Sequence, residues 1–222
     1  ITDLVEGSDF RVFSQVVAKG GVVRGINARG LGDYSRTQLD ELTAFVSRYE
    51  AKGLAYLALT VEGEERSSFV KFIGEETKQA ILERMNAQNG DLLLFVADDQ
   101  DVVCESLGML REELGDRLGL RDDDILGFVW VIDFPLFEWN DDEKRWDPSH
   151  HLFTSPMPED IPYLDTDPGQ ARGQQYDLVL NGNEVSGGSI RIHDSDLQEK
   201  VFGLIGLDLD VARQRFGHML RA

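Results

Sequence analysis

Two runs of eight mostly apolar residues, LAYLALTV (54–61) and DLLLFVAD (91–98), constrain the fold of this chain more than any other feature. Each run has the length of one strand and falls far short of the roughly 20 apolar residues that a membrane-spanning helix needs. Apolar residues recur at helical spacing over 39–49, and further helical patterns cover 75–87 and 103–118. Buried strands that alternate with amphipathic helices predict an α+β fold.

The pattern divides the chain into two parts. Residues 1–122 carry the helices and strands above and contain no catalytic constellation. The acidic stretch RDDDILG (121–127) follows and predicts a domain boundary, with the second part at 123–222. In this second part, residues 128–139 predict a strand. Residues 176–194 predict a hairpin, and two helices are expected after it, over 195–206 and 208–221.

The charge of the chain restricts its partners. The formal net charge is −19, with 41 acidic against 22 basic residues. Contacts to nucleic-acid phosphates need clusters of lysine and arginine, so we expect little direct contact between this chain and a nucleic acid. The single cysteine, Cys104, excludes an intramolecular disulfide and is expected to be a buried structural thiol. The first ten residues lack the features of a signal peptide, so we expect a cytoplasmic protein without a membrane segment.

Two carboxylates of the hairpin are candidates for a metal site. With Gly182-Asn183 as the turn, Asp177 and Glu184 share one face, because side chains alternate along a strand and opposed partners point the same way. Two carboxylates on one face repel each other unless a cation joins them, and Mg²⁺ held by carboxylates and substrate phosphates would do so. The alternative is two exposed acids on a solvated sheet face.

Arg191 is a candidate for anion binding on the same hairpin. It lies seven residues after Glu184, so a regular strand would place the two side chains on opposite faces. A bulge at Gly187-Gly188 would bring them to one face, and glycines inside a strand often mark a bulge. A guanidinium matches a carboxylate in a bidentate manner, which lysine cannot do. The alternative is an ordinary arginine on a solvated strand.

The histidines do not predict a zinc site. His150 and His151 are adjacent, so on an extended chain their side chains point in opposite directions. No cysteine or acidic partner stands near them at metal-ligand spacing. His193 and His218 are expected to be structural or exposed.

Three segments of the second part resemble a known family. They are WVIDFPLFEW (130–139), DPSHHLFTSP (147–156) and YDLVLNGNEVSGGSIRIHDSDLQEKVFG (176–203). In order and spacing they resemble the second half of the catalytic domain of bacterial aspartyl-tRNA synthetases. The first 120 residues resemble the GAD domain that these enzymes carry as an insertion. The resemblance covers essentially the whole chain, and NGNEVSGGSIRIHD is its most specific motif.

The resemblance implies a class II fold, an antiparallel sheet flanked by helices. It also implies an enzyme that activates L-aspartate with ATP and transfers it to tRNA. In that family pattern, His150 contacts the aspartate and the adenylate, and Glu184 binds ATP, partly through Mg²⁺. Asp177 supports the metal region, and Arg191 binds the side-chain carboxylate of the substrate. Asparagine would leave that buried guanidinium without its charge partner.

The chain also departs from the family pattern. Leu152 stands where the family has proline, and Ser186 stands where it has glycine. The anticodon-binding barrel and both arginine motifs that stabilise the transition state are missing, so we expect an internal fragment that is inactive alone and contains no catalytic residue. The parent is expected to be a homodimer. The rival interpretation is a non-catalytic binding or assembly module related to the GAD domains of tRNA-dependent amidotransferases.

Overall fold

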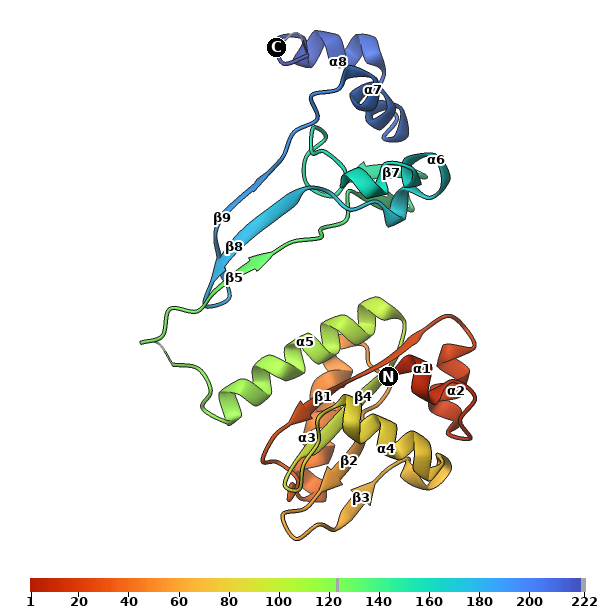
Figure 1. The fold of residues 1–222 in the computed structure, drawn as a ribbon, viewed down its shortest axis with the longest axis vertical. Helices are drawn as coiled ribbons and strands as arrows, with labels where there is room; N and C mark the ends of the chain where they lie inside the picture. The colour runs from red at the N-terminus through yellow and green to blue at the C-terminus, as the bar shows by residue number, and fades with distance from the viewer. Residues whose placement is uncertain (123, 221–222) are drawn as a thin grey trace. The chain divides into compact units, whose positions relative to one another are not determined.

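The computed structural model describes residues 1–122 and 124–220 (Figure 1). The chain forms two compact units, Ile1–Asp122 and Asp123–Ala222. Residue 123, inside the expected boundary stretch 121–127, lies outside the described residues. So do residues 221–222, which include the end of the expected helix 208–221. Each unit has its own sheet and its own core, and the α+β expectation is confirmed.

The first unit is built on one antiparallel sheet. Both apolar runs form central strands in it, each paired on both sides. Every residue of the strand that the second run forms, except Ala97, is buried. The strands, in spatial order, are β1 (Val22–Ala28), β4 (Leu92–Asp98), β2 (Ala55–Leu59) and β3 (Glu65–Ser67).

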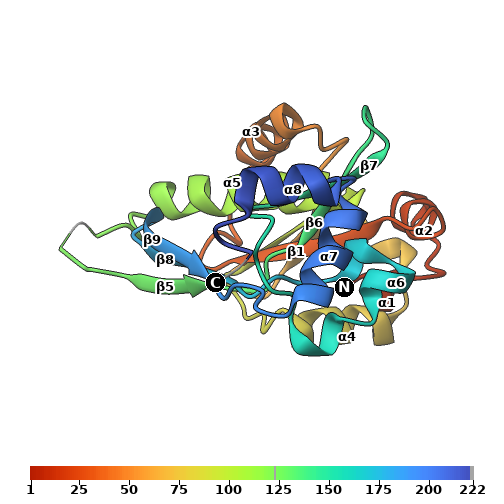
Figure 2. The same ribbon diagram turned by 90° about the horizontal axis from the view of Figure 1, so that it is seen from above.

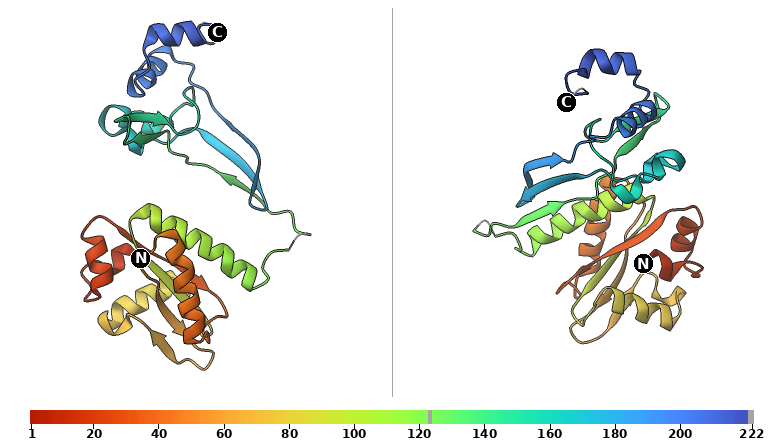
Figure 3. Two further views of the ribbon diagram at one scale, coloured as in Figure 1. Left: turned by 180° about the vertical axis from the view of Figure 1, so that it is seen from behind. Right: turned by 45° about the horizontal axis from the view of Figure 1, so that its top comes forward.

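Helices pack on both faces of this sheet, which explains why residues 92–97 of β4 are apolar without interruption. Leu92, Leu94 and Val96 belong to one buried cluster, together with residues of α3 and α5. Leu93 and Phe95 point the other way, into a second cluster with residues of α1, α2 and α4. Figure 3 shows these helices around the sheet. They are α1 (Thr2–Val5), α2 (Arg11–Val17), α3 (Arg36–Val46), α4 (Glu75–Arg84) and α5 (Gln100–Arg117), with 3₁₀ turns η1 (Ser47–Tyr49) and η2 (Val70–Phe72).

Cys104 corrects one expectation, because its side chain is exposed and not buried. Val103 and Leu107 of the same helix, α5, are in the core, and the helical repeat turns position 104 away from them. The Nη1 atom of Arg24 lies 3.5 Å from the Cys104 sulfur. Apolar residues next to Cys104 in the sequence are therefore not evidence that Cys104 itself is buried.

Residues 1–122, expressed alone, are expected to fold. The two buried clusters of this unit are formed entirely by residues of the first 114 positions, so the core is complete without the second unit. Amide hydrogen exchange on the isolated 122-residue protein is the measurement, and the amides of β4 should be the slowest to exchange. Uniformly fast exchange along the chain would contradict the prediction.

The second unit contains a three-stranded antiparallel sheet and a separate two-stranded ribbon. The expected strand 128–139 is two strands, because the chain turns between them at Asp133, which has a left-handed φ of 61°, and at Pro135. The sheet has the order β5 (Phe128–Val131), β8 (Gln175–Leu180), β9 (Asn183–Ser189), and the ribbon pairs β6 (Phe137–Asn140) with β7 (Arg145–Pro148).

The buried core of the second unit packs against its helices, and, of the residues described, the three-stranded sheet contributes none to it. Phe153, Val201 and Phe202 are among the residues buried there. The two expected C-terminal helices are present within the described residues, and Figure 2 shows them side by side. The helices are α6 (Tyr163–Thr166), α7 (Ser195–Leu204) and α8 (Leu209–Phe216), with 3₁₀ turns η3 (Pro158–Asp160) and η4 (Pro168–Gln170).

The three-stranded sheet is left open to solvent. Phe128 and Trp130 of β5 are 59% and 58% exposed, which is unusual for large apolar residues in a strand. Every residue of β5 is exposed. Among the described residues, no helix is long and apolar enough to cross a membrane.

Candidate functional site

The hairpin of β8 and β9 closes with a two-residue turn. Leu180 pairs with Asn183, so the turn residues are Asn181 and Gly182, with φ of 47° and 81°. Both values are left-handed, as a type I′ turn requires. The expected turn at Gly182-Asn183 is therefore wrong by one residue. The Asn181 side chain accepts from the backbone N–H of Gly127 at 2.8 Å, which ties the turn to the start of β5.

A bulge interrupts β9 directly after the turn. Val179 pairs with Glu184 and Leu178 pairs with Ser186, so Val185 has no partner in the ladder. An irregularity between Glu184 and Arg191 is thus present, as the alternation of side chains requires. Its expected position at Gly187-Gly188 is wrong, because the pairing is regular from residue 186 to residue 189.

The two carboxylates converge on one face of the hairpin. Asp177 pairs with Gly187, and an ideal Cβ built on Gly187 would lie 3.1 Å from Glu184 Oε1 and closer still to Asp177 Oδ1. The Nε2 atom of Gln175 donates to Asp177 Oδ1 at 3.1 Å. Within the described part of the chain, neither carboxylate has an ion-pair partner. A cation at this face would relieve their repulsion, and phosphate oxygens would complete its coordination.

Substituting Gly187 with alanine is expected to disturb this pair. The new methyl group would occupy the space between the two carboxylates and push them apart. In the whole protein, Gly187→Ala should weaken the binding of a divalent cation at this face by about 10-fold, the scale for misplaced metal-site groups. Calorimetric titration of the whole protein with Mg²⁺ measures it. Gly203→Ala is the matched control, because a Cβ there meets nothing within 4 Å. Equal affinities in both variants would contradict the prediction.

Arg191 continues the extended chain beyond β9. From Gly187 the alternation passes through Ser189 to Arg191, so its side chain belongs to the face that carries the two carboxylates. The backbone stays extended there, because Arg191 forms a bridge with Thr154. Arg191 is exposed and, among the described residues, has no ion pair. An unpaired guanidinium in a chain of net charge −19 suits an anionic ligand.

The bridge to Thr154 places the histidine segment beside Arg191. Partial burial and the positive charge of Arg191 both lower the pKa of His151, burial having the larger effect. His151 Nδ1 also accepts from the backbone N–H of Phe153 at 3.2 Å. The ring of His150 lies edge-on to Phe134, with 4.8 Å between ring centroids.

The sequence motif singled out His150, whereas the structure links His151 electrostatically to Arg191. Adjacency in HHLFTSP is the only sequence signal for it. The electrostatic link to Arg191 comes from pairing between segments 37 residues apart, at Thr154 and Arg191. The residues of a single strand do not indicate which distant segment pairs with that strand.

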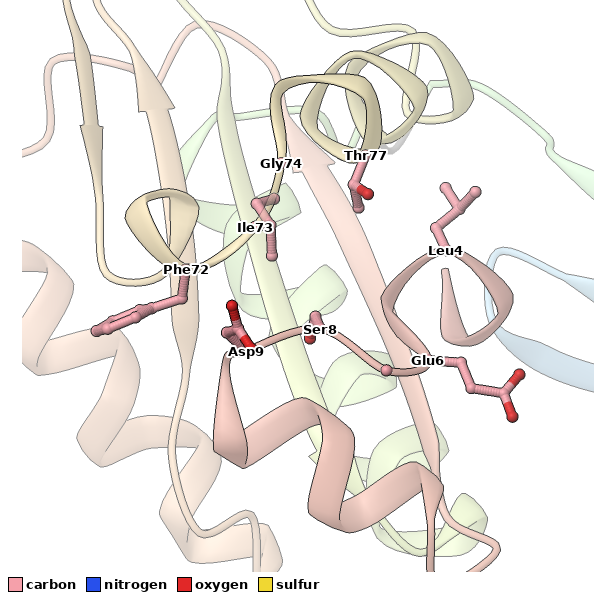
Figure 4. A pocket seen from close by; sticks show the side chains of 9 residues that line it. Leu4, Glu6, Ser8, Asp9, Phe72, Ile73, Gly74 and Thr77 are labelled. Atoms are coloured by element: carbon pink, nitrogen blue, oxygen red, sulfur yellow. The ribbon is translucent and has the colours of Figure 1, made fainter.

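The first unit has a hollow of about 230 Å³ that holds none of these residues (Figure 4). It lies between the loop after α1 and the start of α4. Glu6 and Asp9 contribute carboxylates to its lining, and no basic side chain lines it. It therefore does not suit phosphate or a carboxylate ligand, and the hairpin of the second unit is the stronger candidate.

This chain is similar to a known domain family and to whole proteins. The GAD domain family model matches residues 13–107, inside the first unit. An aspartate–tRNA(Asp/Asn) ligase of Geotalea uraniireducens is 50% identical over 222 residues, and an aspartate–tRNA ligase of Ruminiclostridium cellulolyticum is 48% identical over the same length. An aspartate–tRNA(Asp/Asn) ligase of Rubrobacter xylanophilus is 52% identical over 223 residues. All of this chain is matched in each case, and it spans about 37% of the length of each relative.

Proposed function

We propose that this chain belongs to the aspartate–tRNA ligase family, and that the whole protein activates L-aspartate with ATP and transfers the aspartyl group to tRNA. The similarity extends over the GAD domain and the hairpin alike. It therefore does not favour the alternative of a non-catalytic GAD module. In this proposal the first unit is the insertion domain, and the second is the C-terminal half of a class II catalytic core.

The unpaired guanidinium of Arg191 is the observation that carries the proposal. It shares a hairpin face with Asp177 and Glu184, which have no ion-pair partner among the described residues, so one face offers both a cationic and an anionic binding group. Arg191 would bind the side-chain carboxylate of aspartate in a bidentate manner. Asparagine would leave the guanidinium without a charge partner, which gives a basis for rejecting it.

The carboxylate pair would serve the ATP side of the reaction. Glu184 and Asp177 would hold Mg²⁺ between them, with ATP phosphates as further ligands. When bound, Mg²⁺ neutralises phosphate charge. Gln175 holds the Asp177 carboxylate through its amide group. Their convergence over Gly187 supports this role.

His150 would complete the aspartate site. Its segment pairs with the strand that carries Arg191, which supports a place for it beside the same substrate. The edge-on ring of Phe134 would fix the imidazole, so that its nitrogen atoms are available for hydrogen bonds to aspartate and the adenylate. No residue of this chain is assigned to bond making, because the proposed groups bind and orient the substrates.

The tRNA and a second subunit are proposed as partners of the whole protein. The net charge of −19 supports a tRNA interface that lies mostly outside this chain. A homodimer and a cytoplasmic location are part of the proposal.

Aspartate-dependent exchange of pyrophosphate into ATP tests the proposal. The whole protein should catalyse exchange with L-aspartate and not with L-asparagine. The 222-residue chain alone should show no detectable exchange, because the sheet that carries the proposed site is exposed along β5 and most of β9. Exchange that is independent of aspartate in the whole protein would overturn the function. Exchange by the chain alone would overturn its predicted inactivity.

A further inference from the structure

The guanidinium of Arg172 binds three carboxylates at once. Its Nε and Nη2 atoms donate to Asp160, at 2.7 and 3.1 Å. Nη2 also donates to Glu159 at 3.2 Å, and Nη1 donates to Asp133 at 3.2 Å. The backbone N–H of Arg172 adds a further bond to Asp160, at 3.0 Å. We call Arg172 with these three acids the arginine clip.

Burial makes the clip sensitive to loss of the arginine. The Asp160 side chain is 6% exposed, and hydrogen bonding to Arg172 lowers the pKa of that carboxyl. Without the guanidinium, Asp160 would be a buried charge without its partner. The acids that the clip joins would then repel one another.

The clip lies where two segments of the second unit run side by side. Arg172 forms a bridge with Pro135, and the backbone N–H of Gly173 donates to the Phe134 carbonyl at 2.8 Å. Phe134 is therefore flanked by two attachments to the clip, the side chain of Asp133 and the backbone at residues 172–173. Asp133 has a left-handed φ of 61°, which a non-glycine residue keeps only when its surroundings hold it.

Phe134 carries the effect of the clip to the proposed aspartate site. Its ring is edge-on to His150, with an interplanar angle of 84°. On the other side of the clip, the backbone N–H of Gln174 donates to the carbonyl of Ser155. The backbone N–H of Ser155 in turn donates to the carbonyl of Ile190, which is next to Arg191 in the chain. The segment that holds Arg172 thus joins both proposed aspartate-binding residues.

We propose that Arg172 is a positioning residue for aspartate binding: by holding three carboxylates together, its guanidinium fixes Phe134 and with it the imidazole of His150. The proposal rests on the aspartate-binding role of His150 proposed above. Arg172 touches no substrate in it.

Arg172→Met in the whole protein tests the proposal with two measurements. The first is the rate at which diethyl pyrocarbonate modifies His150, followed by peptide mass spectrometry, with His193 as the internal reference. It should rise, because the ring loses its fixed contact with Phe134. The second is the KM for aspartate, which should rise about 5- to 10-fold while the KM for ATP stays unchanged. Arg172→Lys keeps the positive charge but loses the planar guanidinium. Its values in both measurements should therefore fall between those of the unmodified protein and those of Arg172→Met.

Two further variants keep the test decisive. Arg213→Met is the matched control, because Arg213 is an exposed arginine that also pairs with two acids, Glu199 and Asp210. Asp133→Asn weakens one arm of the clip, because a neutral amide oxygen replaces the carboxylate that accepts from Arg172. It leaves no buried lone charge, and asparagine tolerates a left-handed φ. It should shift both measurements in the same direction, even if Arg172→Met fails to fold.

The outcomes separate this proposal from the proposed function. Unchanged His150 reactivity in Asp133→Asn and Arg172→Lys would overturn the positioning role, whether or not the protein uses aspartate. Raised reactivity with an unchanged KM for aspartate would uphold the clip and overturn the role of His150. Raised reactivity with a raised KM supports both.

Discussion

Under the proposed function, Arg191→Ala in the whole protein is expected to lower kcat/KM for aspartate by an amount equivalent to about 2–5 kcal/mol, the scale for removing one partner of a charge pair that the bound substrate buries. The guanidinium has no ion pair among the described residues, so its loss removes no internal salt bridge. The cost should therefore fall on substrate binding and not on folding. The KM for ATP should change much less, because Glu184 and Asp177 remain.

Pyrophosphate exchange at varied aspartate concentration measures this effect. Arg191→Lys should recover only part of the loss, because an ammonium group cannot form two parallel hydrogen bonds to a carboxylate. Arg145→Ala is the matched control, since Arg145 is a surface arginine of β7 that pairs with Glu143 and Asp147. Equal kcat/KM in Arg191→Ala and the control would remove Arg191 from the site.

Phe95→Ala is expected to destabilise the first unit by about 3–5 kcal/mol, the usual cost of deleting a buried aromatic side chain. Phe95 is fully buried in the central strand β4. Its ring packs edge-on against Phe69 at 5.4 Å and Phe13 at 6.5 Å. Gly25 lies opposite, and a Cβ built there would come 2.5 Å from the ring. The ring thus fills space that no neighbour can take over.

Urea unfolding of residues 1–122, whose independent folding is predicted above, measures the loss. The transition midpoint should fall with little change in slope. Val61→Ala serves as the control, because Val61 is 70% exposed and its truncation should change stability by less than about 0.5 kcal/mol. A loss below 1 kcal/mol for Phe95→Ala would show that the surrounding rings collapse into the space.

The sheet of the first unit was predictable because burial on both faces leaves a plain signal. An uninterrupted apolar run such as 92–97 fits only a strand or a helix in the core, and its length favours a strand. The expected strand 128–139 failed for the opposite reason. Its apolar residues are exposed in β5, so hydrophobicity there did not indicate where the strand ends. The left-handed residue that ends it is an aspartate, which gives only a weak sequence signal.

The irregularity in the hairpin of the candidate site was predictable from the alternation of side chains, but its position was not. Alternation requires an irregularity between Glu184 and Arg191, and the hairpin has one. Glycine indicated the wrong place, because a β-branched residue, Val185, occupies the bulge. The turn was misplaced although Asn181-Gly182 is the stronger turn signal. The relation of His151 to Arg191 depends on pairing between distant segments and lies beyond such reasoning.

The exposed sheet of the second unit has a consequence for handling the protein in solution. β5 is an edge strand, and among the described residues no strand pairs with its outer side. Its large apolar side chains are exposed. Such an edge is a template for pairing with another chain. Concentrated samples of the 222-residue chain should therefore self-associate through β5. A sedimentation or light-scattering mass measured on such samples reports this edge pairing, so the proposed homodimer has to be tested with the whole protein.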